Sequence, residues 1–208
     1  MIKDFNTYIN EGLFDRNQSE FNIRKTDNGI EQVYIPKTKK ELYGYIEIDI
    51  EQAKKDGTYP NVNLSNIDIS ELGNDDLNGL FCNDIYSYII PDISNWNIKY
   101  IPNDFFHGNK QIKEFIIPNS VTSIGERAFE YCVSLTSVTI PNSVIKIEYR
   151  AFSHCKSLTS VTIPNSVTRI GYCAFYWCDS LESATIPKHC NIESNSFPRD
   201  CKITRRDD

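Results

Sequence analysis

The chain has 208 residues, of which 40% are hydrophobic and 12% are aromatic. This composition is enough to build a packed core and argues against general disorder. The formal net charge of −6 gives no basic surface for nucleic acid or anionic lipid. No apolar run approaches the length of a membrane span. From the charge we expect no nucleic-acid partner, and from the charge and the missing apolar run we expect no membrane partner.

The cysteine count and the N-terminal segment bear on where the protein works. The seven cysteines are an odd number, which does not suit a closed disulfide framework. The N-terminal segment MIKDFNTYINEGLFDR contains no apolar core of a secretory signal peptide. We therefore expect no signal peptide and a reducing, intracellular location.

Residues 1–60 show no repeat and predict a helix, a hairpin and a second helix. The first helix is indicated by apolar residues that share one helical face: Ile2, Phe5, Tyr8, Ile9 and Leu13. Residues 20–36 then predict a β-hairpin with Asn28-Gly29 as its turn. We expect this small α+β region to cap the repeats that follow and to cover apolar edges that would otherwise aggregate.

The second helix is predicted between Thr38 and Gly57. The stretch TKKE, from Thr38 to Glu41, has the form of a capping box, and Gly57 is a typical helix stop. The stretch YIEIDI within this segment alternates as a strand does. We favour the helix because the caps fit at both ends.

From residue 112 onward the sequence repeats with a period of 23 residues. The stretch SLTSVTIPNSV occurs at 134–144 and again at 157–167. A period in this range is typical of a solenoid, in which stacked coils share one continuous core. Several columns of residues keep the spacing: Pro118, Pro141, Pro164 and Pro187; Val121, Val144 and Val167; Ile124, Ile147 and Ile170; Ala128, Ala151 and Ala174; Phe129, Phe152 and Phe175; Leu135, Leu158 and Leu181.

Weaker copies extend the repeat in both directions. Upstream, Ile98, Ile101, Phe106 and Ile112 keep the spacing, and NLSNIDI (63–69) echoes DISNWNI (92–98). Downstream, HCNIESNSFPRDCKIT has the character of a diverged terminal coil, as a cap requires. We expect about six coils over residues 61–208, with a domain boundary after residue 60.

The stretch LTSVTIPNSVTRIGYCAFYWC resembles the BspA-like family of leucine-rich repeats. The family's consensus runs from a strand through IPNSVTSIG to AF..C, and the similarity is clear over about residues 112–190 and weaker from about residue 60. The stretches NLSNIDIS and DISNWNIK are also similar to repeats of related bacterial surface proteins. The resemblance implies an α/β fold, a right-handed leucine-rich-repeat solenoid used for binding, with no catalytic residues and no cofactor.

A second resemblance concerns the N-terminal segment. MIKDFNTYINEGLFDR is similar to the leader of tailed-phage internal head proteins, in which a prohead protease cuts after a glutamate. The matching bond in this chain is Glu11-Gly12, preceded by Ile9. The resemblance implies a phage-encoded, virion-associated protein or one active in the phage-infected host. The other interpretation is a plain amphipathic helix packed on the cap, and both can hold in turn.

Cysteines also keep the repeat spacing, so we expect a ladder of thiols inside the solenoid at Cys132, Cys155, Cys178 and Cys201. Stacked coils lie about 4.8 Å apart, whereas Cβ atoms joined by a disulfide lie about 3.8 Å apart. Free buried thiols are therefore favoured over disulfides.

A metal site is not expected from the cysteines. The four that could be combined into one have no C-x-x-C pair among them: Cys173, Cys178, Cys190 and Cys201. His154 adjoins Cys155, but the two point to opposite sides of the strand-like path, so no catalytic pair is expected.

Two surfaces are candidates for binding. Outward-facing hydroxyl groups form a surface that we name the hydroxyl face: Thr136, Thr139, Thr159 and Thr162. A second set of aromatic residues in register forms what we name the aromatic ridge: Tyr131, Tyr149, His154, Tyr172, Tyr176 and Trp177. Tyrosine and tryptophan are enriched at interface hot spots. The alternatives are that threonine simply suits exposed strands and that the aromatic rings are partly buried against the next coil.

These observations favour a non-enzymatic protein-recognition module with a protein partner of unknown identity and no small-molecule substrate. A structural virion or surface-assembly protein is the alternative. An enzyme within residues 1–60 is the third possibility, and no acid–base constellation supports it there.

Overall fold

The computed structural model describes residues 21–26, 29–59, 61–64, 67, 69–70, 72–82, 86–93 and 96–207. The chain divides into two compact units, one formed by the chain up to Asp76 with Pro91–Trp96, and the other by Leu77–Ile90 with Asn97–Asp208. The domain boundary after residue 60 stays a prediction. The predicted helix over residues 2–13 lies outside the described residues.

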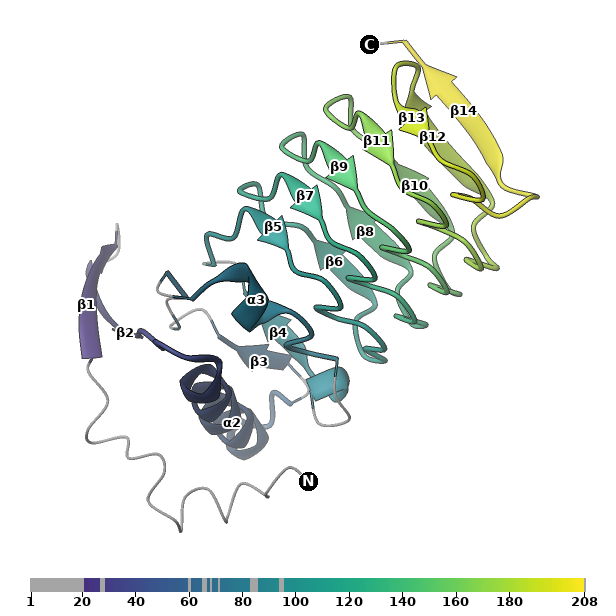
Figure 1. Cartoon of the computed structure of the whole chain (residues 1–208). Coiled ribbons are helices and arrows are strands. Elements are labelled where there is room, and N and C mark those ends of the chain that lie inside the picture. Colours follow the sequence, from purple (N-terminus) through teal and green to yellow (C-terminus); the bar gives the residue numbers. More distant parts are fainter. Residues whose placement is uncertain are drawn as a thin grey trace. The chain divides into compact units, whose positions relative to one another are not determined.

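The predicted hairpin is present in the N-terminal unit. Strands β1 (Phe21–Thr26) and β2 (Gly29–Tyr34) pair antiparallel, with Thr26 opposite Gly29 (Figure 1). Gly29 therefore belongs to a strand, and its prediction as a turn residue is wrong; Asn28 lies outside the described residues.

Helix α2 (Lys39–Asp56) confirms the second predicted helix and its two caps. The Thr38 side chain accepts a hydrogen bond from the Glu41 backbone N–H at 3.2 Å, and a Glu41 carboxylate oxygen accepts one from the Lys37 N–H at 2.8 Å. Gly57 ends the helix with a left-handed backbone, φ 71°. The strand-like alternation of YIEIDI is overridden because both ends of the helix have their backbone groups satisfied.

The upstream copies also form structure. β3 (Asn61–Asn63) and β4 (Ile90–Asp92) make a two-stranded sheet, and the Leu64 N–H donates to the Asp92 carbonyl at 3.1 Å. The Trp96 indole N–H donates to the Leu64 carbonyl at 3.1 Å, and its ring is buried. The short helix α3 (Asn74–Leu77) and the 3₁₀ turn η1 (Tyr86–Tyr88) lie between these strands in the sequence.

The second unit contains a solenoid, as the repeat predicts, but with about five turns rather than the six expected. One side is a parallel five-stranded sheet whose neighbours follow chain order: β5 (Tyr100–Ile101), β7 (Ser123–Ile124), β9 (Lys146–Ile147), β11 (Arg169–Ile170) and β13 (Asn191–Ile192). Figure 1 shows these strands side by side along the stack. The paired residues Ser123 and Lys146 are 23 positions apart, so one coil of the solenoid takes 23 residues of the chain.

The other side of the solenoid carries two parallel sheets. The first pairs β6 (Glu114–Ile116) with β8 (Ser137–Thr139). The second joins β10 (Ser160–Thr162), β12 (Ser183–Pro187) and β14 (Lys202–Arg206). The last coil is shorter than the others, because Ser183 pairs with Lys202 and Arg169 pairs with Asn191.

The core is a column of stacked phenylalanine rings, which we name the Phe column: Phe106, Phe129, Phe152, Phe175 and Phe197. Successive ring centroids lie 5.2, 5.0, 5.1 and 5.0 Å apart, and the rings are buried. The predicted stacking of residues 23 apart is confirmed.

The thiol ladder lies beside the Phe column. The thiols of Cys132, Cys155 and Cys178 are fully buried, and each donates to the carbonyl oxygen of a phenylalanine in the preceding coil at 3.1–3.2 Å. Cys201 is only half-buried, because the shortened last coil does not enclose it.

Candidate recognition surface

Four successive coils carry two backbone positions with positive φ between their two strands, and the last coil carries only the first of them. The first position is held by Asp104, Arg127, Arg150, Cys173 and Asn195. The second is held by Gly108, Tyr131, His154 and Trp177, with φ values of 74°, 61°, 61° and 58°. The second position is therefore where three members of the aromatic ridge leave the backbone.

A left-handed backbone is unfavourable for an aromatic residue. It costs roughly 1–2 kcal/mol for a residue with a Cβ atom, whereas glycine adopts it freely. Gly108 is the residue that suits this position, yet the next three coils place large rings there. Strained residues of this kind cluster at functional sites, which makes this column a candidate site on physical grounds.

The rings at the second position, which we name the first row of the ridge, stack on one another along the solenoid. The Tyr131 and His154 ring centroids lie 4.3 Å apart, and those of His154 and Trp177 lie 6.0 Å apart, with interplanar angles of 25° in both cases. Tyr176 meets Trp177 edge-on at 5.2 Å. Tyr131 is 42% exposed and Trp177 52% exposed, whereas His154 between them is half-buried, so the stack is open to solvent at its first and last rings.

The remaining ridge residues form a second row. The Tyr149 and Tyr172 rings are almost parallel, with centroids 6.1 Å apart, and Tyr172 is 42% exposed. The Arg150 guanidinium lies over the Tyr149 ring at 5.1 Å. Arginine joins tyrosine and tryptophan as a residue type enriched at hot spots, and the sequence reasoning missed it here.

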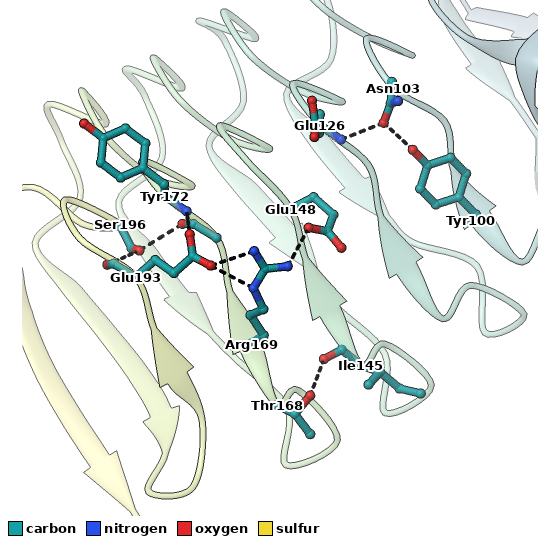
Figure 2. A network of polar contacts seen from close by, with 11 residues as sticks. Tyr100, Asn103, Glu126, Ile145, Glu148, Thr168, Arg169, Tyr172, Glu193 and Ser196 are labelled. Atoms are coloured by element: carbon teal, nitrogen blue, oxygen red, sulfur yellow. Dashed lines mark hydrogen bonds and ion pairs between the residues drawn. The ribbon is translucent and has the colours of Figure 1, made fainter.

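An ion-pair clasp holds the second row in place. Arg169 contacts Glu148 at 3.2 Å and Glu193 at 2.6 Å, so one side chain ties three coils together (Figure 2). The other carboxylate oxygen of Glu193 accepts a hydrogen bond from the Tyr172 N–H at 2.9 Å. The backbone that carries the Tyr172 ring is thereby fixed before any partner arrives.

A buried acid lies beneath the first row. Glu130 is only 2% exposed, and its carboxylate oxygens lie 3.7 Å from His107 Nε2 and 3.5 Å from Arg150 Nη1. Neither Glu130 Oε1 nor Arg150 Nε has a hydrogen-bond partner in the described part of the chain. No pattern in the repeats indicated this group, because the same register position holds Ser153 and Tyr176 in the next coils.

The surroundings of His154 favour the neutral form of its imidazole. Burial lowers its pKa, although the Glu130 carboxylate opposes the shift. The Ser153 hydroxyl lies 2.9 Å from His154 Nδ1 and fixes the ring. The neighbouring Cys155 points into the core, and burial raises the pKa of its thiol, so the pair cannot act as nucleophile and base.

The hydroxyl face is also on the surface, on the strands of the other side. Thr136, Thr139, Thr159 and Thr162 are all exposed. The Thr136 hydroxyl donates to the Lys113 carbonyl at 2.9 Å, which is a structural role between coils. The predicted leader residues Glu11 and Gly12 lie outside the described residues.

Two other kinds of feature are absent from the described part of the chain. No group of three or more His, Cys, Asp or Glu side chains there has an arrangement suited to a metal ion. Among the helices described, none combines the length and the apolar character needed to cross a bilayer.

Comparison with known proteins identifies the family of the repeats. The family model described as a BspA type leucine rich repeat region matches residues 99–206 in six copies. A leucine-rich-repeat protein of T. pallidum is similar over 90% of this chain and 67% of its own, with 18% identity and a TM-score of 0.49. One from Bacteroides ovatus is similar over 51% of this chain and 43% of its own, with 25% identity and a TM-score of 0.34. Comparison with curated proteins gave no match. Since the family model covers more than half of the sequence, the chain belongs to the BspA-type leucine-rich-repeat family.

Proposed function

We propose that this protein is a non-enzymatic recognition module that binds a protein partner through the aromatic ridge. The observation that carries the proposal is the stack of Tyr131, His154 and Trp177 on left-handed backbone positions, with Tyr131 and Trp177 exposed. Leucine-rich repeats serve generally in protein interactions, and the residue types on this surface are those that dominate binding energy in interfaces.

The rigidity of the solenoid supports affinity. Binding costs free energy for ordering side chains, about 0.5–1.5 kcal/mol for each flexible side chain that becomes fixed. In the ridge, stacking already orders the Tyr131 and His154 rings, and the Arg169 clasp orders the backbone at Tyr172. The ridge side chains have therefore already lost much of their conformational entropy on folding, and binding a partner costs less.

The proposal is tested by capturing partners from a lysate of the producing cell with three proteins. These are the wild type, the ridge variant Tyr172→Ala/Trp177→Ala and a matched variant of the hydroxyl face, Thr159→Ala/Thr162→Ala. We expect the ridge variant to lose at least about tenfold in captured partner, because truncated hot-spot residues typically cost 2 kcal/mol or more. The hydroxyl-face variant should capture as the wild type does. Equal capture by all three proteins would remove the ridge from this role.

The N-terminal resemblance supports a finer proposal, that the protein is phage-encoded and packaged in the head before it meets a host component. The leader would then be removed at the Glu11-Gly12 bond. Mass spectrometry of material from purified particles should find Gly12 as the first residue. A chain that still begins with Met1 would eliminate this packaging route and leave the recognition role untouched.

A further inference from the structure

An arginine of the last strand shows what the proline-containing turns of the solenoid can bind. The Arg206 guanidinium donates from Nη2 to the Ile163 carbonyl at 2.7 Å and from Nε to the Asn165 side-chain oxygen at 2.8 Å. In the sheet Arg206 pairs with Pro187, so its side chain reaches past this proline to the coil before it. Two adjacent donors of one planar group thus meet two oxygens of one turn, which the single ammonium of a lysine cannot do in the same way.

The Ile163 carbonyl is available because a proline removes its partner in the ladder. In a parallel pair, the N–H of a residue donates to the carbonyl before its partner, and its carbonyl accepts from the N–H after its partner. The Ile163 N–H follows this pattern and donates to the Thr185 carbonyl at 2.8 Å. The residue that should donate to the Ile163 carbonyl is Pro187, which has no N–H. Arg206 supplies the missing donor.

The same arrangement occurs two coils earlier without an arginine. The residues at the equivalent positions are Ile117, Asn119 and Pro141. The Ile117 N–H makes its ladder bond at 3.1 Å, and Pro141 again stands where the donor to the Ile117 carbonyl should be. The register position of Arg206 holds Pro164 here, so the repeat provides no donor. Within the described residues, neither the Ile117 carbonyl nor the Asn119 side chain takes part in a hydrogen bond.

The residues that carry these two acceptors line a groove on the surface. The groove has a volume of about 450 Å³ and no charged side chain in its lining, which consists of Ile116, Ile117, Asn119, Thr139, Ile140, Pro141, Asn142 and Ser143. Ile116 is 76% exposed, although the same register position holds Thr139 and Thr162 in the next coils. The groove therefore combines two oxygen acceptors with an apolar wall, which suits a side chain that has an aliphatic stem and a polar end.

We propose that this groove is the docking site for an arginine side chain of a protein partner. The guanidinium donates to the Ile117 carbonyl and the Asn119 side-chain oxygen, and the aliphatic stem packs on Ile116 and Pro141. The net charge of −6 favours the approach of a cationic segment. The groove shares no residue with the aromatic ridge, and the inference does not depend on the ridge's role.

Two capped amino acids, N-acetyl-arginine methylamide and N-acetyl-lysine methylamide, test the site on the full chain. Each is titrated into isotope-labelled protein while NMR follows the backbone amide signals of Ile117 and Thr139. We expect the arginine probe to shift these signals saturably, with a dissociation constant at least about tenfold lower than that of the lysine probe, because lysine lacks the planar pair of donors. Equal dissociation constants for the two probes, or no saturable shift with the arginine probe at about 50 mM, would overturn the proposal.

A pair of matched variants locates the site. Asn119→Ala removes one acceptor and suits the local backbone, since Asn119 is not among the residues with positive φ. It should raise the dissociation constant of the arginine probe at least about tenfold, because a hydrogen bond to a charged group is lost. Asn165→Ala is the control at the equivalent turn, where Arg206 already occupies the acceptor, and it should leave the constant unchanged. Unchanged binding by Asn119→Ala would contradict the assignment.

The same variant distinguishes a different protein from a second copy of this chain as the source of the arginine. In sedimentation equilibrium at the concentration used for NMR, we expect the wild type to be monomeric. A wild-type dimer that Asn119→Ala dissociates would place an arginine of a second copy in the groove, and it would overturn the assignment to another protein.

Discussion

The Phe column and the aromatic ridge are built by the same geometry and differ in what they face. Both are rows of rings that recur once per coil and stack along the solenoid, with centroids 5.0–5.2 Å apart in the column and 4.3–6.0 Å apart in the first row of the ridge. The column is buried, whereas three members of the ridge are exposed and the other three are half-buried. Stacking alone therefore does not distinguish a structural row from a binding row.

The identity of the residues does distinguish them. Every coil from Phe106 to Phe197 places phenylalanine in the column, because a close-packed interior tolerates little change in shape. The ridge position changes from Gly108 to Tyr131, His154 and Trp177 along the chain. Constancy among repeats within one chain thus reports the core, and variation at a strained exposed position reports a surface free to acquire specificity.

The largest expected effect is on the column. Phe152→Ala should lower the free energy of unfolding by about 3–5 kcal/mol, because it removes a ring packed between Phe129 and Phe175 and leaves a cavity. Chemical denaturation monitored by circular dichroism measures this loss. A change below about 1 kcal/mol would mean that the column is not the core of the solenoid.

A smaller effect separates strained ridge positions from ordinary ones. At Tyr131, the glycine variant should be more stable than the alanine variant by about 1 kcal/mol, because only alanine retains the Cβ atom that a left-handed backbone disfavours. At Ala128, in the same turn but without a positive φ, replacement by glycine should destabilise by roughly 0.5–1 kcal/mol. If glycine and alanine were equally stable at Tyr131, the ridge backbone would not be strained.

The smallest expected effect is a pH dependence of the ridge. Burial holds the pKa of His154 below its ordinary value of 6.5, so the unfolded chain takes up the proton at higher pH than the folded chain does. The contribution of His154 to stability is therefore fully present above this value and is lost as the pH falls through 6.5 toward the lowered pKa. The difference in unfolding free energy between the wild type and His154→Gln should become less favourable to the wild type over that range. A difference that stays constant with pH would show that His154 titrates normally.

Much of the fold follows from the sequence because the repeat spacing converts directly into height along the stack. The positions of Phe152, Cys155 and the Thr38 and Gly57 caps are fixed by periodicity and by local hydrogen bonding. The site was predicted only as a set of aromatic residues in register. Gly108, in register with Tyr131, was the one available signal that this position needs a positive φ.

The remaining features depend on contacts that periodicity does not encode. The burial of Glu130 depends on Arg150 and His107 from neighbouring coils, which approach only once the coils stack. Ile140 is 8% exposed and Ile163 is fully buried, although both belong to copies of the same eleven residues. Identical sequences thus acquire different surroundings from their neighbours in the stack.

The central claim is that the column stabilises the fold while the ridge serves recognition. It is tested most directly by the unfolding free energy of the Tyr172→Ala/Trp177→Ala variant, measured beside that of Phe152→Ala. We predict a loss of no more than about 1 kcal/mol for the ridge variant, because exposed substitutions away from the core have small effects. A loss comparable to that of Phe152→Ala would show that the ridge rings are part of the packing, and it would contradict the account.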